Sequence, residues 1–418
     1  MFPSRRTKAS GLATGGGDVF RDEYSLEFDG SNDRLNFGDV TSFDGLDDMT
    51  ISMWIKYKDT NNQVFISKGN YNTSGDSFQF NMNPSNSNGR MRFSVDGDGG
   101  SGGFWYINNA ALAGKCEINK WNHIAVAYSN TNDTVIFYIN GNEYAATSSG
   151  GSFIAIPDTS VELHIAMDRG GNDWFYGNIS DTAIYNTNLN HSQINQIYNG
   201  REPYNHKEGP LSKNLICWWR MGDGVLDSYP LITDSSTITS LGTDLITNGT
   251  FDSNVTGWSD NDGGGGGAVT HETSVKYSGA GSAKITWPDP PVDYWGMMTT
   301  SNVSSVQANT VYLIEAYIYI PSGFDGGDCW LTDGSSFGSA TAEDSLKAFS
   351  SITNEWQYTR LIFRTAADTG GKLYVRSAST PSATKYIFVD SITMRPVTGG
   401  VPGHTYNMAH TCYTGDTP

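Results

Sequence analysis

The sequence predicts an all-β protein made of two β-sandwiches, and three observations carry this prediction. The chain has 418 residues, which suits two sandwiches of about 150–200 residues each better than one. Aromatic residues make up 12% and charged residues only 17%, with 48 glycines, a composition that favours strands and turns over helices. Apolar residues also alternate along much of the chain, as they do in half-buried strands.

Charge and cysteine content exclude several classes of protein. Asp and Glu outnumber Lys and Arg by 44 to 26, for a net charge of −18. This charge repels nucleic acid and anionic membranes, so we expect no nucleic-acid partner. No run of 18 apolar residues is present, so no membrane span is expected. The cysteines form no C-x-x-C pair, which argues against a metal–thiolate cluster: Cys116, Cys217, Cys329 and Cys412.

Residues 1–22 form a basic, Gly-rich arm without periodicity. The arm is expected to be a disordered tail, and the alternative is an arm that becomes ordered on a partner. No apolar core follows Arg5 and Arg6, so neither a secretory nor a twin-arginine signal is expected. The protein is therefore expected to fold in the cytoplasm in which it is made, or to leave by a route that needs no signal.

Residues 23–204 alternate persistently and predict an antiparallel sandwich. Asn140-Gly141 lies between two apolar runs and predicts a two-residue hairpin turn. One short helix is expected over Ser192–Asn199, with Gly200 just past its end. The alternating runs are Met49–Ile55, Ile124–Tyr128, Val135–Ile139 and Val161–Met167.

Five motifs follow one another along this first block. They are Ser25–Asp33 (SLEFDGSND), Thr50–Lys56 (TISMWIK), Lys120–Val126 (KWNHIAV), Phe137–Gly141 (FYING) and Tyr176–Asp181 (YGNISD). In kind and order these motifs resemble those of the laminin-G-like, concanavalin-type jelly rolls, with Asn140 in place of the family's Asp in the hairpin.

Residues 205–243 are expected to connect the two domains. Asn214–Gly224 (NLICWWRMGDG) resembles a W-x-M-G-D-G segment that accompanies such jelly rolls in structural proteins of marine bacteriophages. In physical terms the segment is expected to be a strand that either adds to the first sandwich or bridges the two domains.

Residues 244–397 are expected to begin and end with a strand, at Asp244–Asp252 (DLITNGTFD) and at Ile387–Met394 (IFVDSITM). Both segments resemble the corresponding strands of a galactose-binding-like carbohydrate-binding module, which implies a second jelly roll. Residues 398–418 are rich in Gly and Pro and are expected to form an irregular C-terminal tail.

The sequence offers little support for an enzyme. The histidines form no H-E-x-x-H pair, which argues against a zinc site. Gly334–Gly338 fits G-x-S-x-G, but the α/β context that a nucleophile elbow needs is absent, so a Gly/Ser loop is expected. The E-x-D-x-E strand of concanavalin-type glucanases does not occur, although a glycosidase needs two such carboxylates. We therefore expect a non-enzymatic protein.

Structural calcium is the cofactor that the resemblances imply. The first jelly roll would use Asp29 and Asp181, and the second would use Asp252 and Asp390. Calcium needs several oxygen ligands from carboxylates and carbonyls. The alternative for each Asp is that it caps a turn or accepts backbone amides. Asp96–Gly100 misses the EF-hand pattern and is expected to be a hairpin tip.

Glycan binding requires aromatic side chains near polar groups, because sugars present C–H faces beside hydroxyls. Six aromatic residues near loops are the candidates, and the alternative is that they cover a sandwich end or an interface. They are Trp105, Tyr106, Trp174, Tyr294, Trp295 and Trp330.

The expected function is that of a non-enzymatic bacteriophage virion surface protein, a capsid decoration or a fibre component. The arm would bind other virion proteins, and the jelly rolls would bind cell-surface glycans. A homo-oligomer on the virion surface would convert weak contacts into avidity. The alternative is a bacterial adhesin, or the carbohydrate-binding part of a secreted polysaccharide-degrading system. A purely structural role also stays open, since fold alone does not establish binding.

Overall fold

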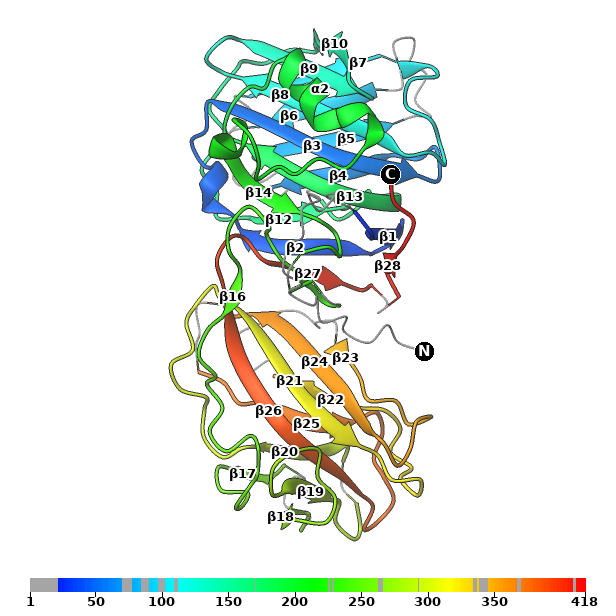
Figure 1. The fold of residues 1–418 in the computed structure, drawn as a ribbon, viewed down its shortest axis with the longest axis vertical. Helices are drawn as coiled ribbons and strands as arrows, with labels where there is room; N and C mark the ends of the chain where they lie inside the picture. Colours follow the sequence, from blue (N-terminus) through cyan, green and yellow to red (C-terminus); the bar gives the residue numbers. More distant parts are fainter. Residues whose placement is uncertain are drawn as a thin grey trace, which may run out of the picture.

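The computed structural model describes residues 22–418 apart from 70–76, 84–89, 97–101, 109–111, 169, 225, 228, 262–265, 292, 334–336, 338–344, 367–369 and 409–410. These residues form two β-sandwiches, one above the other in Figure 1, which confirms the predicted all-β fold class. No helix among them is long and apolar enough to cross a membrane. The arm up to residue 21, most of the Asp96–Gly100 tip and all of Gly334–Gly338 except Phe337 lie outside the described residues.

The first sheet of the upper sandwich is built from the predicted alternating runs. Asn140 and Gly141 both have positive φ, 49° and 78°, and they join two paired strands as predicted. Among the described residues the strand order is β10 (Asn142–Ala145), β9 (Thr134–Ile139), β8 (Asn122–Ser129), β3 (Asp48–Tyr57), β13 (Tyr176–Tyr185), β1 (Ser25–Asp29) and β28 (Tyr413–Thr414), and β14 (Leu215–Trp219) also pairs with β13.

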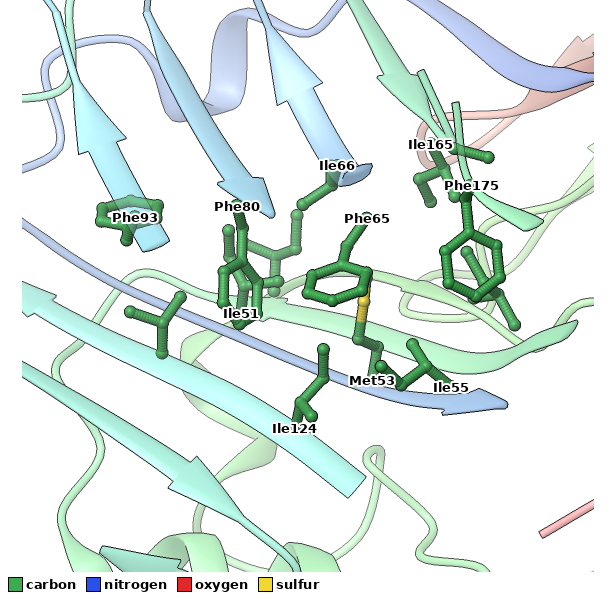
Figure 2. Close-up of a cluster of buried hydrophobic side chains, with 14 of the residues drawn as sticks. Ile51, Met53, Ile55, Phe65, Ile66, Phe80, Phe93, Ile124, Ile165 and Phe175 are labelled. Atoms are coloured by element: carbon green, nitrogen blue, oxygen red, sulfur yellow. The ribbon is translucent and has the colours of Figure 1, made fainter. Parts of the chain in front are cut away.

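The second sheet packs face to face against the first. Its described strands run in the order β11 (Thr147–Ser148), β7 (Gly103–Ile107), β6 (Arg90–Val95), β5 (Phe78–Asn83), β4 (Gln63–Lys68), β12 (Glu162–Ile165), β2 (Arg34–Asp39), β27 (Gly403–Tyr406) and β15 (Leu231–Ile232). Figure 2 shows Ile51, Met53 and Ile55 of β3 facing Phe65 and Phe80 of the opposite sheet, all five fully buried. Period-2 alternation thus places one apolar face of each sheet in a shared core.

One helix covers the outer face of the first sheet. The helix α2 (His191–Tyr198) confirms the predicted one within a residue, and Asn190 and Gln193 form a capping box at its start. Ile194 and Ile197 pack on the sheet together with Trp218. Short 3₁₀ turns lie at η1 (Thr41–Phe43), η2 (Asn199–Arg201) and η3 (Ser212–Asn214).

The lower sandwich also has two sheets. One contains β18 (Ala268–Glu272), β19 (Ser282–Thr286), β26 (Tyr386–Thr398), β21 (Val311–Tyr319), β24 (Trp356–Arg364) and β23 (Ser345–Leu346), with β16 (Ser240–Leu241) beside β26. The other contains β17 (Trp258–Asp260), β20 (Trp295–Thr299), β25 (Tyr374–Ser377) and β22 (Cys329–Thr332). Their inner faces enclose a second core, which includes Met297, Leu331 and Val375.

The sequence predicted an irregular C-terminal tail over residues 398–418, but the structure places two short strands in this segment, β27 and β28. After β26 the chain returns to the upper sandwich, where β27 pairs with both β2 and β15, and β28 pairs with β1. Met408 and Cys412 lie in the upper core. Composition alone did not reveal these strands, because each is short and finds its partner far away in the sequence. The lower sandwich is therefore inserted into the upper one.

The two sandwiches meet along a mixed apolar and polar contact. Leu231 of β15 packs with Leu313 and Ile362 of the lower sandwich. The Arg364 guanidinium donates from one nitrogen to the carbonyl oxygens of Phe37, at 2.7 Å, and Pro402, at 2.9 Å. Burial lowers the pKa of Arg364 to about 10. Because these carbonyls belong to the upper sandwich and the returning chain, the arginine joins both sandwiches.

Candidate functional site

The outer face of the four-stranded lower sheet carries a cluster of aromatic rings around one arginine. Alternation turns Trp330 of β22 and Arg376 of β25 away from the core, while their neighbours Leu331 and Val375 point into it. Arg376 lies opposite Trp330 on one side and opposite Trp295 of β20 on the other. Three adjacent strands therefore place these three side chains in one row.

The rings surround the guanidinium of Arg376. Its central carbon lies 4.0 Å from the ring centre of Tyr294, 4.7 Å from that of Trp330 and 5.2 Å from that of Trp295. Tyr374 packs edge-on against Trp295, with ring centres 5.2 Å apart. We call Tyr294, Trp295, Trp330, Tyr374 and Arg376 the Arg376 face; all five are half-buried.

Three of the six predicted glycan-binding residues meet on this face, Tyr294, Trp295 and Trp330, although the sequence placed them in separate loops. Trp105 does not belong to any surface site. Its side chain is 3% exposed and packs 4.5 Å from Phe153 in the upper core, so this candidate is wrong. The next residue along β7 is Tyr106, another of the six candidates.

The other two candidates lie on the upper sandwich, apart from the Arg376 face. Tyr106 faces the opposite way from Trp105 along β7 and is half-buried. Trp174 is also half-buried and forms a β-bridge with Met167. The structure does not bring these two rings into one cluster with the three of the lower sandwich.

Sequence reasoning missed Arg376 and Tyr374. Alternation in a strand would place Lys372, Tyr374 and Arg376 on one face, which is the signal that could have found them. The pairing of β25 between β20 and β22 was needed to bring that face to the tryptophans. A further aromatic surface on the opposite sheet was also missed, where Tyr277 stacks on Tyr317 with ring centres 3.5 Å apart.

Comparison with known protein families assigns both sandwiches. Residues 29–195 match the family model described as the concanavalin A-like lectin/glucanases superfamily, a laminin-G-type model. Residues 243–384 match the model described as a carbohydrate binding domain. The chain carries a laminin-G-like domain followed by a carbohydrate-binding module. No curated protein matches the chain.

Several solved structures are similar to one part of the chain. A SAP-like pentraxin from Limulus polyphemus is 18% identical, with 42% of this chain and 82% of that chain covered and a TM-score of 0.33. A CBM22 xylan-binding domain from Paenibacillus barcinonensis is 18% identical, with coverages of 38% and 97% and a TM-score of 0.30. A putative carbohydrate binding protein from Bacteroides ovatus is 14% identical, with coverages of 52% and 56% and a TM-score of 0.37.

In the laminin-G-like domain, the two Asp residues predicted to share a calcium ion lie apart. Asp29 is opposite Tyr176 at the start of β13, and Asp181 is five residues further along that strand, or about 16 Å away. Asp29 instead accepts the backbone N–H of Ser31 at 2.8 Å, which closes a turn.

In the carbohydrate-binding module, the two predicted calcium residues hold opposite ends of one turn. Asp390 is fully buried and accepts the backbone N–H groups of Tyr277, at 2.9 Å, and Ser278, at 3.0 Å. Asp252 accepts the N–H of Ala280 at 2.5 Å. Both carboxylates thus do what the turn-capping alternative expected. Among the described residues, no group of three or more His, Cys, Asp or Glu side chains is placed to hold a metal.

Asp181 is the centre of a buried polar network in the laminin-G-like domain. It sits at a bulge of β13 with φ 48°, between the part of the strand that pairs with β1 and the part that pairs with β14. His206 Nε2 lies 3.1 Å from its Oδ2, and Trp218 Nε1 donates to its Oδ1. Burial alone would raise the pKa of Asp181, but His206 and these hydrogen bonds outweigh it and lower that pKa.

The W-x-M-G-D-G segment beside this network contacts Asp22 and Glu23. Arg220 of the W-x-M-G-D-G segment lies 3.4 Å from Asp22, and Asp223 accepts the N–H of Glu23 at 2.8 Å. Burial, together with the nearby charge of Asp181, raises the pKa of Asp22 to about 8, against the opposing effect of Arg220. The segment therefore anchors the point from which the N-terminal arm departs.

The raised pKa of Asp22 predicts a pH-dependent stability. Below pH about 4 both folded and unfolded chains hold this proton, whereas between pH 4 and 8 only the folded chain keeps it, so stability falls as pH rises and levels off above 8. The free energy of unfolding of Asp22→Asn should not show this fall. As pH rises, the variant should become more stable relative to the natural protein by at most about 1.4 kcal/mol per pH unit. Urea unfolding from pH 5 to 8.5 measures the difference, and a constant difference would contradict the assignment.

Proposed function

We propose that this protein is a non-catalytic carbohydrate-binding protein that holds glycans on the Arg376 face. The observation that carries the proposal is the convergence of Tyr294, Trp295 and Trp330 on one sheet face around Arg376. The family-model match over residues 243–384 supports the same module as the binding unit.

Sugar rings suit this face for a physical reason. Their apolar C–H surfaces pack on aromatic rings, while their hydroxyls need polar partners within the same site. Half-buried rings on strands are held by their own packing, as Trp295 is by Tyr374, so little side-chain entropy is lost on binding. The Arg376 face therefore offers both aromatic rings and a polar side chain, held by adjacent strands of one sheet.

Removing two rings from the face should abolish most glycan binding. We expect Trp295→Ala with Trp330→Ala to weaken retention by a bound polysaccharide by ten- to a hundredfold, because burial of one large apolar side chain is worth roughly 1.5–3 kcal/mol. A glycan array identifies ligands of the natural protein, and affinity electrophoresis in the best polymer then compares the variants.

Trp356→Ala is the matched control, since this tryptophan is also half-buried but lies on β24 of the opposite sheet. It should leave retention unchanged while reporting any general loss of folding. Equal losses in both variants would contradict the assignment of the site. Absence of any retained glycan from the natural protein at high valency would favour the purely structural role.

We further propose that the protein works at the surface of a bacteriophage virion, as a homo-oligomer anchored through the arm at residues 1–22. The W-x-M-G-D-G segment supports this setting by its resemblance to phage structural proteins, and it contacts Asp22, the last residue of the arm. A bacterial adhesin or a part of a polysaccharide-degrading system is equally consistent with the two modules. Neighbouring capsid or tail genes would favour the virion role, and polysaccharide-degradation genes would favour the alternative.

A further inference from the structure

The Arg376 face has a cationic centre in a strongly acidic protein. The chain carries a net charge of −18, yet no carboxylate of the described residues forms an ion pair with Arg376, whereas Arg360 pairs with Glu315. The guanidinium of Arg376 makes one weak hydrogen bond within the described part of the chain, from Nε to the Ser377 carbonyl at 3.4 Å. Its charge is therefore not neutralised locally.

A second cation lies beside the first. The ammonium of Lys347 is 4.4 Å from the ring centre of Trp330, the same ring that contacts Arg376. Two acidic residues stand next to the rings in the described part of the chain. Asp293 Oδ1 accepts the backbone N–H of Trp295 at 2.9 Å, and Asp328 Oδ1 accepts the backbone N–H of Ser350 at 2.7 Å. The rings thus gather positive charge, and these two adjacent carboxylates are engaged with backbone N–H groups.

The rings also orient the guanidinium. An arginine whose flat face rests on aromatic rings keeps its N–H groups, which lie in its own plane, free to donate at the edge. This planar fork matches the paired oxygens of a carboxylate or a sulfate and can bind them bidentately. A neutral sugar would need the rings but would leave the fork without a charged partner.

We infer that the Arg376 face selects glycans that carry an anionic group, a uronic-acid carboxylate or a sulfate ester. The inference rests on the proposed function and names its ligand class. Arg376 binds the anion, Lys347 adds to the local positive potential, and the edges and open faces of Trp295, Tyr294 and Trp330 contact the sugar. The acidic remainder of the surface repels polyanions, so binding is confined to this face.

The test compares charged polymers with close neutral counterparts. Polygalacturonate is matched with its fully methyl-esterified form, and agarose is matched with a sulfated galactan, against the full-length protein in affinity electrophoresis and calorimetry. We expect at least tenfold tighter binding to one or both charged partners, falling as salt rises from 0.05 to 0.5 M. The two pairs distinguish a carboxylate from a sulfate as the recognised group.

Variants assign the effect to the arginine. Arg376→Gln should lose at least tenfold in affinity for the charged polymer, with less than threefold change for the neutral one, and Arg376→Lys should be intermediate because it keeps the charge without the fork. Lys284→Gln is the matched control: this ammonium also lies over a ring, 4.1 Å from that of Tyr386, but on the opposite sheet. It should bind as the natural protein does.

The outcomes separate the inference from the proposed function. Equal, salt-insensitive binding to charged and neutral polymers would overturn the inference and leave the glycan-binding proposal standing. Binding to no polymer of either kind would overturn both. If Lys284→Gln loses the preference for charged polymers as much as Arg376→Gln does, the preference comes from the positive charges of the whole surface. That result would also overturn the inference. Thermal unfolding checks each variant, and Lys347→Gln gives a second reading if Arg376→Gln fails to fold.

Discussion

A chain that stops after Thr398 is expected to lose the cooperative unfolding of its laminin-G-like domain. Without residues 399–418, β1 and β2 each lose a paired strand. The core loses Met408, which is 3% exposed and worth about 2–3 kcal/mol. Trp219 Nε1 loses its acceptor, the Val401 carbonyl at 2.8 Å. With about 1 kcal/mol for each strand hydrogen bond, the total is on the order of the stability of a whole domain.

Calorimetry checks this expectation, because the two domains have separate cores and should give separable transitions. The transition of the carbohydrate-binding module should persist in the shortened chain, while that of the laminin-G-like domain should disappear or fall by tens of degrees. An unchanged pair of transitions would show that β27 and β28 do not pair as described.

A single substitution tests the same contact in the full-length chain. A Cβ at Gly403 would lie 2.4 Å from the ring of Phe37, so Gly403→Val should cost about 1–3 kcal/mol through overcrowding. The matched control is Gly323→Val in an exposed loop of the carbohydrate-binding module, where the closest atom is the flexible end of Lys385 at 3.8 Å. The control should change stability by no more than about 0.5 kcal/mol.

The second large effect is expected at Asp181. Asp181→Ala removes the acceptor of both His206 and Trp218, which are fully or almost fully buried. Breaking a buried pair from one side costs about 3–5 kcal/mol, or roughly 10 °C in the Tm of a domain of this size. Differential scanning fluorimetry of the full-length chain measures the shift.

The same experiment tests the predicted calcium sites. Asp29→Ala, in an exposed turn, should cost only about 1 kcal/mol, since it removes a turn-closing hydrogen bond. If the hydrogen-bond network is complete in itself, a chelator leaves the Tm of the natural protein unchanged. A chelator-dependent fall in Tm that Asp181→Ala abolishes would instead support calcium at this carboxylate.

The sequence pattern predicted the elements whose conformation depends on residues close together in the chain. The Asn140-Gly141 hairpin and the helix at His191–Tyr198 followed from residues next to one another. The tail did not, because β27 pairs with a strand more than 360 residues earlier and has only four residues of its own. Nothing in the composition of residues 398–418 distinguishes such a strand from a loop.

The candidate site could be predicted in part for the same reason. Alternation states that Trp105 and Tyr106 face opposite ways but not which of them faces the core; both were candidates, and Trp105 proved to be the buried one. Tyr294, Trp295 and Trp330 were identified singly as aromatic residues near loops. Their meeting around Arg376 depends on the strand order β20-β25-β22, which is a long-range property of the sheet.

The insertion of one sandwich into the other decides how the molecule would carry mechanical tension. Ser25 of β1 lies opposite Thr414 of β28, and the two connections to the inserted sandwich leave and re-enter through the neighbouring strands β15 and β27. A pull applied at Tyr24 and Gly415 therefore passes between adjacent strands of one sheet. The carbohydrate-binding module lies outside this load path, so a pull between these two residues reaches it only after β1 and β28 separate.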